Sequence, residues 1–242
     1  MKIAVPTHRR SSVIQNLTLS VLNGISKDSI YIFISDEADM QLYKESCLGY
    51  NLILCHTKTA TEKFNFIQNY FEEGTFVIVI EDDIKKIQSL VTDDAQKIFN
   101  FIENYCVNKR INAFGVYPSS NKFFMKKTIE TGFTYLVANL FGFRAAKSPE
   151  LLCRMSSKTD YERSVLFYKY YGELVRFNFI ACSTNNYTNK GGMQEEKNRD
   201  VLENQSSQML VRLYPEYFAI NHKRKSKYLE LKVNKNVIQE KI

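Results

Sequence analysis

Three consecutive acidic residues, Glu81, Asp82 and Asp83, follow directly after the apolar run at positions 76–80. Adjacent carboxylates repel one another, so their placement near a buried strand end requires a partner that offsets the repulsion and the lost hydration. A divalent cation is the simplest such partner, and a ligand set made only of oxygen favours Mg²⁺ or Mn²⁺ over zinc. Because side chains alternate along a strand, we expect Glu81 and Asp83 to share the ion while Asp82 faces the opposite side. The alternative is a solvated acidic turn that caps a helix beginning near Ile84.

Strand and helix patterns alternate through the residues that lead up to this acidic run. Near-continuous apolar strands separated by amphipathic helices are typical of a parallel sheet with helices on both faces. Ligands bind beyond the carboxyl ends of the strands in such sheets, so the three acids lie where a binding crevice is expected. We expect strands at 2–6, 29–35, 51–56 and 76–80, and helices at 11–23, 37–48 and 61–72.

The second half of the chain is less regular but also mixes helices and strands. Thr159 or Asp160 is expected to cap the start of a helix, and Gly172 is expected to end it. A chain of 242 residues, 44% of them apolar, is expected to fold as one domain with a substantial buried core. We expect helices at 93–106 and 159–172, strands at 112–118 and 174–183, and a pair of short strands within 131–145.

The net charge and the cysteine content indicate which partners and which cellular compartment to expect. A formal net charge of +7 suggests an anionic partner such as nucleic acid, a phosphate-bearing ligand or a membrane surface, with simple solubility as the alternative. The five cysteines are odd in number and form no CxxC pair, which favours reduced core thiols over a zinc site or a disulfide framework. No apolar run approaches the roughly 18 residues of a membrane helix, and the N-terminus does not have the pattern of a signal peptide. We therefore expect a cytoplasmic protein with no membrane partner.

Several segments resemble GT-A glycosyltransferases. A parallel α/β half that ends in Asp-x-Asp, or its Glu variant, is similar to that family, and Glu81-x-Asp83 stands in this place. VPTHRR (5–10) resembles the opening of these enzymes, where the first strand meets the nucleotide, and SDEAD (35–39) resembles the second strand end, where an acid contacts uridine. TEKFNFI (61–67) resembles the helix whose basic residue and Asn face the phosphates. The resemblance implies a Rossmann-like, mainly parallel sheet with helices on both faces, plus a smaller mixed region on the acceptor side.

The resemblance also implies a UDP-sugar donor and a Mn²⁺ or Mg²⁺ ion held by Glu81 and Asp83. His222 could add a third metal ligand, because these enzymes often recruit a C-terminal histidine, with an ordinary surface histidine as the alternative. The chain departs from the family pattern where Glu81 replaces the first Asp and where Lys63 replaces an Arg. Asp36 has the alternative role of a helix cap, Lys63 that of an exposed helix lysine, and the Gly pair that of a turn. The residues implied to bind the nucleotide sugar are Pro6, Thr7, Arg9, Asp36, Lys63, Asn65, Asp82, Gly191 and Gly192.

Two later segments resemble a narrower group, the TET-associated glycosyltransferases of phages and large viruses, which are related to the base J glucosyltransferase. They are TDYERSVLFYKYYGELVRFNFIA (159–181) and the Gly-Gly loop NKGGMQ (189–194). This group implies transfer of a sugar to a hydroxymethylated pyrimidine in DNA, in the host cytoplasm if the protein is viral. The resemblance covers most of residues 1–218. It implies a single domain with a half that binds the nucleotide sugar at 1–90, an acceptor half at 91–220 and a basic C-terminal tail at 221–242.

Sugar transfer to a hydroxyl needs a carboxylate that accepts the proton of the acceptor. Asp160 is the first candidate for this general base and Glu162 the second, while helix capping is the alternative role of Asp160. Phe123, Phe124 and Tyr187 could stack on an exposed base, with burial of the two phenylalanines as the alternative. The residues expected to contact the DNA backbone are Arg10, Lys122, Lys126, Lys127, Lys190, Lys223, Arg224 and Lys225.

Other functions fit parts of the same pattern. A glycosyltransferase acting on a protein, glycan or lipid, or a nucleotidyltransferase, would use the same α/β layout. A non-catalytic nucleic-acid-binding protein would explain the net positive charge. The pair Glu81 and Asp83 argues against that last class, because acids weaken phosphate binding unless a metal is present.

Overall fold

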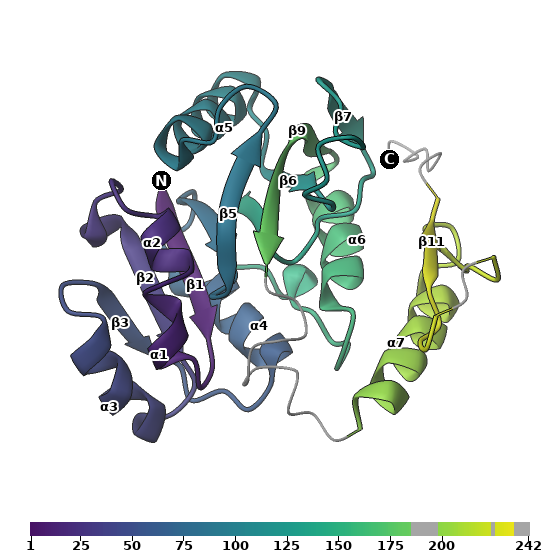
Figure 1. Cartoon of the computed structure of the whole chain (residues 1–242). Helices are drawn as coiled ribbons and strands as arrows, with labels where there is room; N and C mark the ends of the chain where they lie inside the picture. Colours follow the sequence, from purple (N-terminus) through teal and green to yellow (C-terminus); the bar gives the residue numbers. More distant parts are fainter. Residues whose placement is uncertain (185–197, 224–225, 235–242) are drawn as a thin grey trace.

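The computed structural model describes residues 1–184, 198–223 and 226–234, and within these residues one large sheet organises the fold (Figure 1). Its strands lie in the order β3-β2-β1-β4-β8-β6-β9-β5, with β7 paired to β9 outside this path. The strand bounds are β1 Lys2–Thr7, β2 Ile30–Ile34, β3 Asn51–Leu54, β4 Phe76–Ile80, β5 Ile84–Ser89, β6 Ala113–Tyr117, β7 Ile129–Gly132, β8 Leu140–Arg144 and β9 Leu174–Thr184. A separate two-stranded pair is formed by β10 Phe218–Ile220 and β11 Leu231–Val233.

Strand direction brings several carboxyl ends to one edge of the sheet. Strands β1 to β4 are mutually parallel where they pair, and β8 runs antiparallel between β4 and β6. Because β6 and β9 are parallel to each other, the strands β1, β4, β6 and β9 all point the same way. Their carboxyl ends carry Thr7, Ile80, Tyr117 and Thr184, so the acidic run after β4 lies at an edge that several segments reach.

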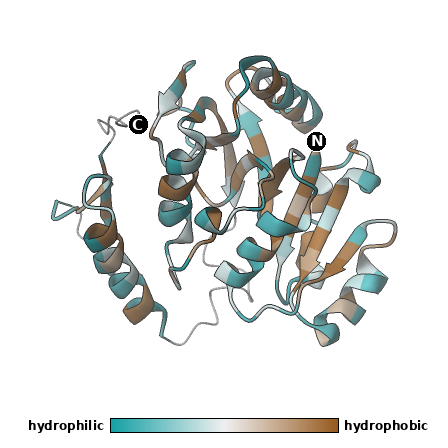
Figure 2. Ribbon diagram, turned by 180° about the vertical axis from the view of Figure 1, so that it is seen from behind, coloured by the Kyte–Doolittle hydropathy of each residue, from teal (hydrophilic) through white to brown (hydrophobic). Residues whose placement is uncertain are grey.

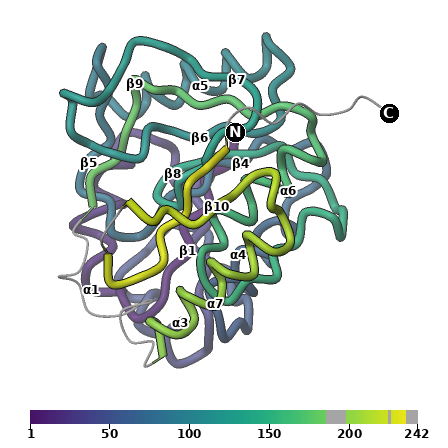
Figure 3. The backbone as a smooth tube through the Cα atoms, turned by 90° about the vertical axis from the view of Figure 1, so that its right-hand side faces the viewer, coloured from purple at the N-terminus to yellow at the C-terminus, as the bar shows by residue number. Residues whose placement is uncertain are grey.

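The helices cover both faces of this sheet and bury two apolar clusters. One cluster contains Ile14, Leu19, Tyr43 and Phe99, from α1, α2, α3 and α5. The other, on the opposite face, contains side chains of α4, α6, α7 and β10, and Figure 3 shows α7 and β10 on this side. Figure 2 shows that the central strands are mainly hydrophobic, whereas the surrounding helices carry hydrophilic segments. The helix bounds are α1 Ser11–Ile14, α2 Thr18–Val21, α3 Glu37–Ser46, α4 Ala60–Tyr70, α5 Ala95–Lys109, α6 Thr159–Tyr171 and α7 Arg199–Leu213, with 3-10 turns at Lys27–Ser29 and Pro149–Leu151.

The predicted mainly parallel sheet with helices on both faces is confirmed. All five cysteines are buried and unpaired, as expected of core thiols. In the described residues, no helix is long and apolar enough to cross a membrane.

Some local predictions are wrong. The single helix expected at 11–23 is two short helices, and the segment after the acids is strand β5 rather than a helix beginning near Ile84. The N-cap of α6 is Lys158, in a left-handed conformation, so neither Thr159 nor Asp160 caps this helix.

Gly142 is required where β8 crosses the centre of the sheet. A Cβ atom at this position would lie 2.1 Å from the Phe114 ring and 2.8 Å from the carbonyl oxygen of Val77. We expect Gly142→Ala to lower the free energy of unfolding by about 1–3 kcal/mol, because a packed core resists an added methyl group. At Gly115 the closest contacts are less severe, namely the end of the Leu136 side chain at 2.9 Å and the Leu136 Cα atom at 3.3 Å. Urea unfolding should therefore show a smaller loss for Gly115→Ala, and equal losses would contradict this packing argument.

Candidate functional site

The acidic residues form a tight turn between β4 and β5. The Thr18 hydroxyl fastens this turn, since it donates to the Glu81 carbonyl oxygen at 2.6 Å and accepts from the Ile84 amide at 2.9 Å. Asp82 and Asp83 both face Arg10, whose Nη1 lies 2.5 Å from Asp82 Oδ1 and 3.1 Å from Asp83 Oδ2. The prediction that Asp82 faces away from its neighbour is therefore wrong, because these residues have left the β conformation that makes side chains alternate.

A hydrogen-bond chain joins the end of β1 to this turn. The Thr7 hydroxyl donates to Asp82 Oδ2 at 2.6 Å, and the Tyr43 hydroxyl, 2.5 Å away, therefore donates to Thr7. The same Tyr43 oxygen accepts from the Arg10 amide at 3.0 Å. One turn earlier on α3, Asp39 accepts from the Arg9 amide at 2.7 Å. Helix α3 thus fixes the loop that carries Arg9 and Arg10 over the acids.

Burial and mutual repulsion set the charge state of the acids. Burial, together with the charges of Asp83 and Asp82, raises the pKa of Glu81 to about 8. Burial, followed by the charge of Asp82, also raises the pKa of Asp83, while Arg10 opposes the shift. Asp83 Oδ1 is buried and has no hydrogen-bond partner among the described residues. An orphaned carboxylate oxygen beside a second acid is the kind of donor that Mg²⁺ or Mn²⁺ prefers, so Glu81 and Asp83 fit a divalent ion.

The predicted three-residue metal set is not assembled. Within residues 1–184, 198–223 and 226–234, no group of three His, Cys, Asp or Glu side chains is placed to hold a metal ion. His222 follows β10 in an exposed turn of the C-terminal segment, which explains why it does not join Glu81 and Asp83. We therefore correct the expectation that His222 completes the metal site.

Asp160 belongs to the electrostatic environment of the acidic turn. It lies in the first turn of α6 and is only partly buried. The Tyr135 hydroxyl donates to Asp160 Oδ2, and the Tyr161 amide donates to Oδ1 at 3.1 Å. The charge of Asp160 is among the causes that raise the pKa of Glu81. A partly exposed carboxylate that is held in place and whose charge acts on Glu81 is suited to accept a proton from a bound substrate.

Glu162 has a structural role instead. It is fully buried, and its Oε2 accepts from the amides of Arg154 at 2.7 Å and Met155 at 2.8 Å. Its two hydrogen bonds fix the loop before α6, and no substrate reaches a fully buried carboxylate. The alternative that Glu162 is the general base is therefore wrong.

We expect Glu162→Ala to lower the free energy of unfolding by about 2–4 kcal/mol, because two buried amides lose their acceptor. Glu173→Ala, at an exposed position, should change stability by no more than about 0.5 kcal/mol. Thermal and urea unfolding measure both variants. A Glu162→Ala protein that unfolds like the wild type would show that this carboxylate does not hold the loop.

Several residues predicted to bind the donor have internal partners. Asp36 accepts from the Asp39 amide at 2.8 Å, which confirms its alternative role as the N-cap of α3. Lys63 is buried and donates to the Thr7 carbonyl oxygen, so it is not an exposed helix lysine. The Asn65 amide exchanges two hydrogen bonds with the Cys153 backbone, at 2.8 and 2.9 Å. Lys63 and Asn65 thus position β1 and the loop before α6.

The other predicted donor residues lie in different places. Pro6 is part of β1 and Thr7 ends it, as the resemblance implied. Arg9 is exposed and has a left-handed backbone with φ of 54°. Gly191 and Gly192 lie outside the described residues.

The residues expected to contact DNA divide into three sets. Arg10 is bound to Asp82 and Asp83, with its side chain 11% exposed, so the expectation that it grips a phosphate backbone is wrong for this conformation. Lys122, Lys126, Lys127 and Lys223 are exposed, and Phe123 and Phe124 beside them are 85% and 53% exposed rather than buried in the core. Lys190, Arg224, Lys225 and Tyr187 lie outside the described residues.

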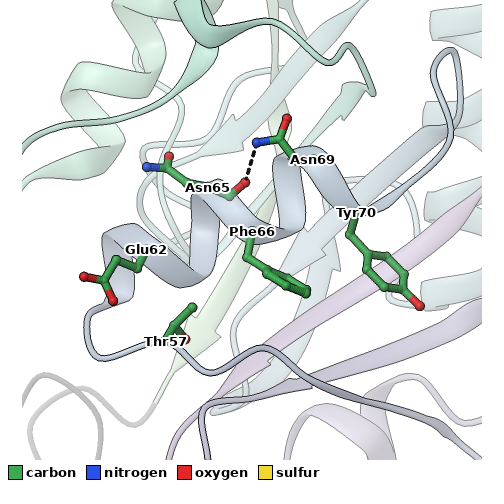
Figure 4. Close-up of a pocket in the computed structure, with 6 residues that line it drawn as sticks. All are labelled: Thr57, Glu62, Asn65, Phe66, Asn69 and Tyr70. Carbon is green, nitrogen blue, oxygen red and sulfur yellow. Dashed lines mark hydrogen bonds between the residues drawn. The ribbon is translucent and has the colours of Figure 1, made fainter.

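A shallow hollow of about 520 Å³ lies on the outer surface of α4, away from the acidic turn (Figure 4). Figure 4 shows Asn65 and Asn69 on one side and the rings of Phe66 and Tyr70 on the other, with Asn69 donating to the Asn65 carbonyl oxygen at 3.2 Å. The lining residues contain none of the acids described above, so this hollow is separate from the candidate site. They are Thr57, Glu62, Asn65, Phe66, Asn69 and Tyr70.

Sequence reasoning missed Asp39, Tyr43 and Tyr135, which hold the loop Arg9–Arg10 and the Asp160 carboxylate in place. Asp39 and Tyr43 are four residues apart and so share one face of α3, which is the only signal the sequence offers for them.

Comparison with known proteins identifies the fold but not a family. No protein-family model matches the chain, and no curated protein matches its sequence. Glucosyl-3-phosphoglycerate synthase from Mycobacterium tuberculosis, in complex with phosphoglyceric acid, matches with a TM-score of 0.50 and 10% identity, covering 90% of this chain and 82% of that chain. A second structure of that synthase matches with a TM-score of 0.50 and 10% identity, covering 92% and 84%. The chain therefore has the GT-A-like fold that the sequence predicts.

Proposed function

We propose that this protein is a glycosyltransferase that transfers a sugar from a UDP-sugar donor with the help of a divalent cation. The observation that carries the proposal is the acidic turn Glu81–Asp83 at the carboxyl end of β4, with the buried and orphaned Asp83 Oδ1 inside it. The structural likeness to a glucosyl-transferring synthase supports the same class of reaction.

The donor would bind across the ends of β1 and β4. Glu81 and Asp83 would hold Mn²⁺ or Mg²⁺, which, when bound, counterbalances the negative charge that develops on the departing diphosphate. Thr7 and Asp82 are joined by a hydrogen bond and keep the two strand ends at a fixed separation. The exposed Arg9, on the loop held by α3, would face the phosphates of the donor.

Asp160 would act as the general base. The acceptor hydroxyl attacks the anomeric carbon, its proton passes to the Asp160 carboxylate, and the bond from that carbon to the diphosphate oxygen breaks to release UDP. The Tyr135 hydroxyl orients Asp160 by donating to one of its oxygens, which leaves the carboxylate partly exposed toward a substrate.

For the acceptor, we propose a hydroxymethylated pyrimidine in DNA, and the cytoplasm as the place of the reaction. The net charge of +7 and the exposed Lys126, Lys127 and Lys223 support a polyanionic acceptor. The exposed rings of Phe123 and Phe124 are suited to stack on an unpaired base. Five unpaired cysteines support a reducing compartment. The division into a donor half at 1–90, an acceptor half at 91–220 and a basic tail at 221–242 is part of the same proposal.

The proposal is tested by incubating the protein with UDP-sugars, Mn²⁺ and DNA that contains hydroxymethylcytosine, followed by mass spectrometry of the digested nucleosides. We expect a hydroxymethylcytosine nucleoside whose mass has increased by one sugar residue. Transfer only to a protein, glycan or lipid in a parallel panel would overturn the DNA acceptor but keep the reaction class. No sugar transfer or donor hydrolysis with any UDP-, GDP- or CMP-sugar would overturn the glycosyltransferase itself.

A further inference from the structure

Arg10 occupies the place where the acids need a positive charge. Its Nη1 bridges two carboxylates, at 2.5 Å from Asp82 Oδ1 and 3.1 Å from Asp83 Oδ2, and its side chain is 11% exposed. Its backbone amide is held by Tyr43, at 3.0 Å, and the preceding Arg9 has φ of 54°. The loop is therefore built so that the Arg10 guanidinium lies on the acids rather than in solvent.

The carboxylates of Asp82 and Asp83 cannot bind Arg10 and a divalent cation at full strength at the same time. A hydrogen bond between charged groups that are partly buried is much stronger than one in water, and its loss leaves a carboxylate without compensation. Asp83 has one oxygen on Arg10 and the other, Oδ1, buried without a hydrogen-bond partner in the described part of the chain. A cation bound to Oδ1 would lie on the same carboxylate as the Arg10 guanidinium, so the repulsion between the two positive charges would weaken the bond between Asp83 and Arg10.

We propose that Arg10 is a built-in counter-ion of Asp82 and Asp83 that competes with the divalent cation for these acids. This inference rests on one part of the proposed function, namely that the turn Glu81–Asp83 binds a divalent cation. Binding of the cation and binding of Arg10 to these acids are then thermodynamically linked. The bound cation lowers the affinity of the acids for Arg10, and bound Arg10 lowers their affinity for the cation by the same factor. In the absence of a cation, Arg10 keeps the buried acids compensated and the site closed to weakly bound ions.

The test is a titration of the full chain with Mn²⁺, in which electron paramagnetic resonance measures free Mn²⁺, with no sugar or acceptor present. We expect Arg10→Gln to bind Mn²⁺ about tenfold more tightly than the wild type, which corresponds to about 1.4 kcal/mol. Arg212→Gln removes the same charge from an exposed position on α7 and controls for net charge, so it should match the wild type. The double variant Arg10→Gln with Asp83→Asn should lose the gain, because it lacks the acid for which Arg10 competes.

The inference is overturned if Arg10→Gln binds Mn²⁺ no more tightly than Arg212→Gln, or if the gain persists in the double variant. Thermal unfolding establishes that each variant is folded, and Arg10→Lys, which keeps the charge but cannot form the same bridge, should give a gain smaller than tenfold. The titration does not measure sugar transfer. Failure of every donor in the transfer assay would thus overturn the proposed function and leave the Mn²⁺ result standing, whereas an unchanged Mn²⁺ affinity would remove only the role given to Arg10.

Discussion

Replacing Glu81 and Asp83 together with alanine is expected to reduce kcat/KM for sugar transfer by about three orders of magnitude. These two carboxylates are the oxygen donors of the proposed cation site, and electrostatic stabilisation of a departing group is commonly worth factors of about 10²–10³ for a single interaction. The variant should also lose its Mn²⁺-dependent affinity for UDP. Release of UDP in a coupled assay measures turnover, and isothermal titration measures the affinity.

Asp83→Ala also removes one partner of the largely buried Arg10, so thermal unfolding must show that the double variant is folded before its turnover is compared. Glu173→Gln removes one negative charge at the exposed amino end of β9 and should keep wild-type turnover. If the double variant turned over at the wild-type rate and bound UDP with the wild-type affinity, these acids would have no part in the reaction.

Asp160→Asn is expected to lower kcat by a factor of about 10²–10⁴ while the affinity for the donor changes by less than about threefold. A positioned general base contributes a factor of this size, and Asn can still accept the hydrogen bond from Tyr135 but cannot take up the proton. Single-turnover kinetics separate the chemical step from donor binding.

A matched control for Asp160 lies on another helix. Asp200, in the first turn of α7, pairs with Lys227 at 2.6 Å on the surface. Asp200→Asn makes the same chemical change there and should retain wild-type kcat. A kcat for Asp160→Asn within tenfold of the wild type would rule out Asp160 as the general base and leave it a structural acid.

The layers of the fold could be predicted from the sequence because the strands and helices are marked by local patterns. The apolar run Phe76–Ile80 is buried along its whole length, and Gly172 ends α6 as expected. The segment Ile84–Ser89 could not be assigned so easily, because its buried residues do not follow a strict alternation and its start follows three acids. The short strands β10 and β11 carry too few residues for any periodicity to show.

The side-chain partners within the site could not be predicted in the same way. Arg10 is separated by more than 70 residues from Asp82 and Asp83. No local sequence pattern indicates which basic side chain pairs with which acidic side chain over such a separation. The resemblance to GT-A enzymes assigned Lys63 to the phosphates, whereas the fold uses it to hold the carbonyl of Thr7. The resemblance therefore did not reveal the internal partners of Lys63 and Asp36.

The central claim is that the turn Glu81–Asp83 binds a nucleotide sugar through a divalent cation. The most direct measurement is isothermal titration of the wild-type chain with UDP, first with Mn²⁺ and then with excess chelator. We predict binding that saturates at one UDP per chain with Mn²⁺ and that is lost when the chelator is added. Binding of UDP that is equally tight in chelator, or no binding of UDP in either condition, would contradict the claim.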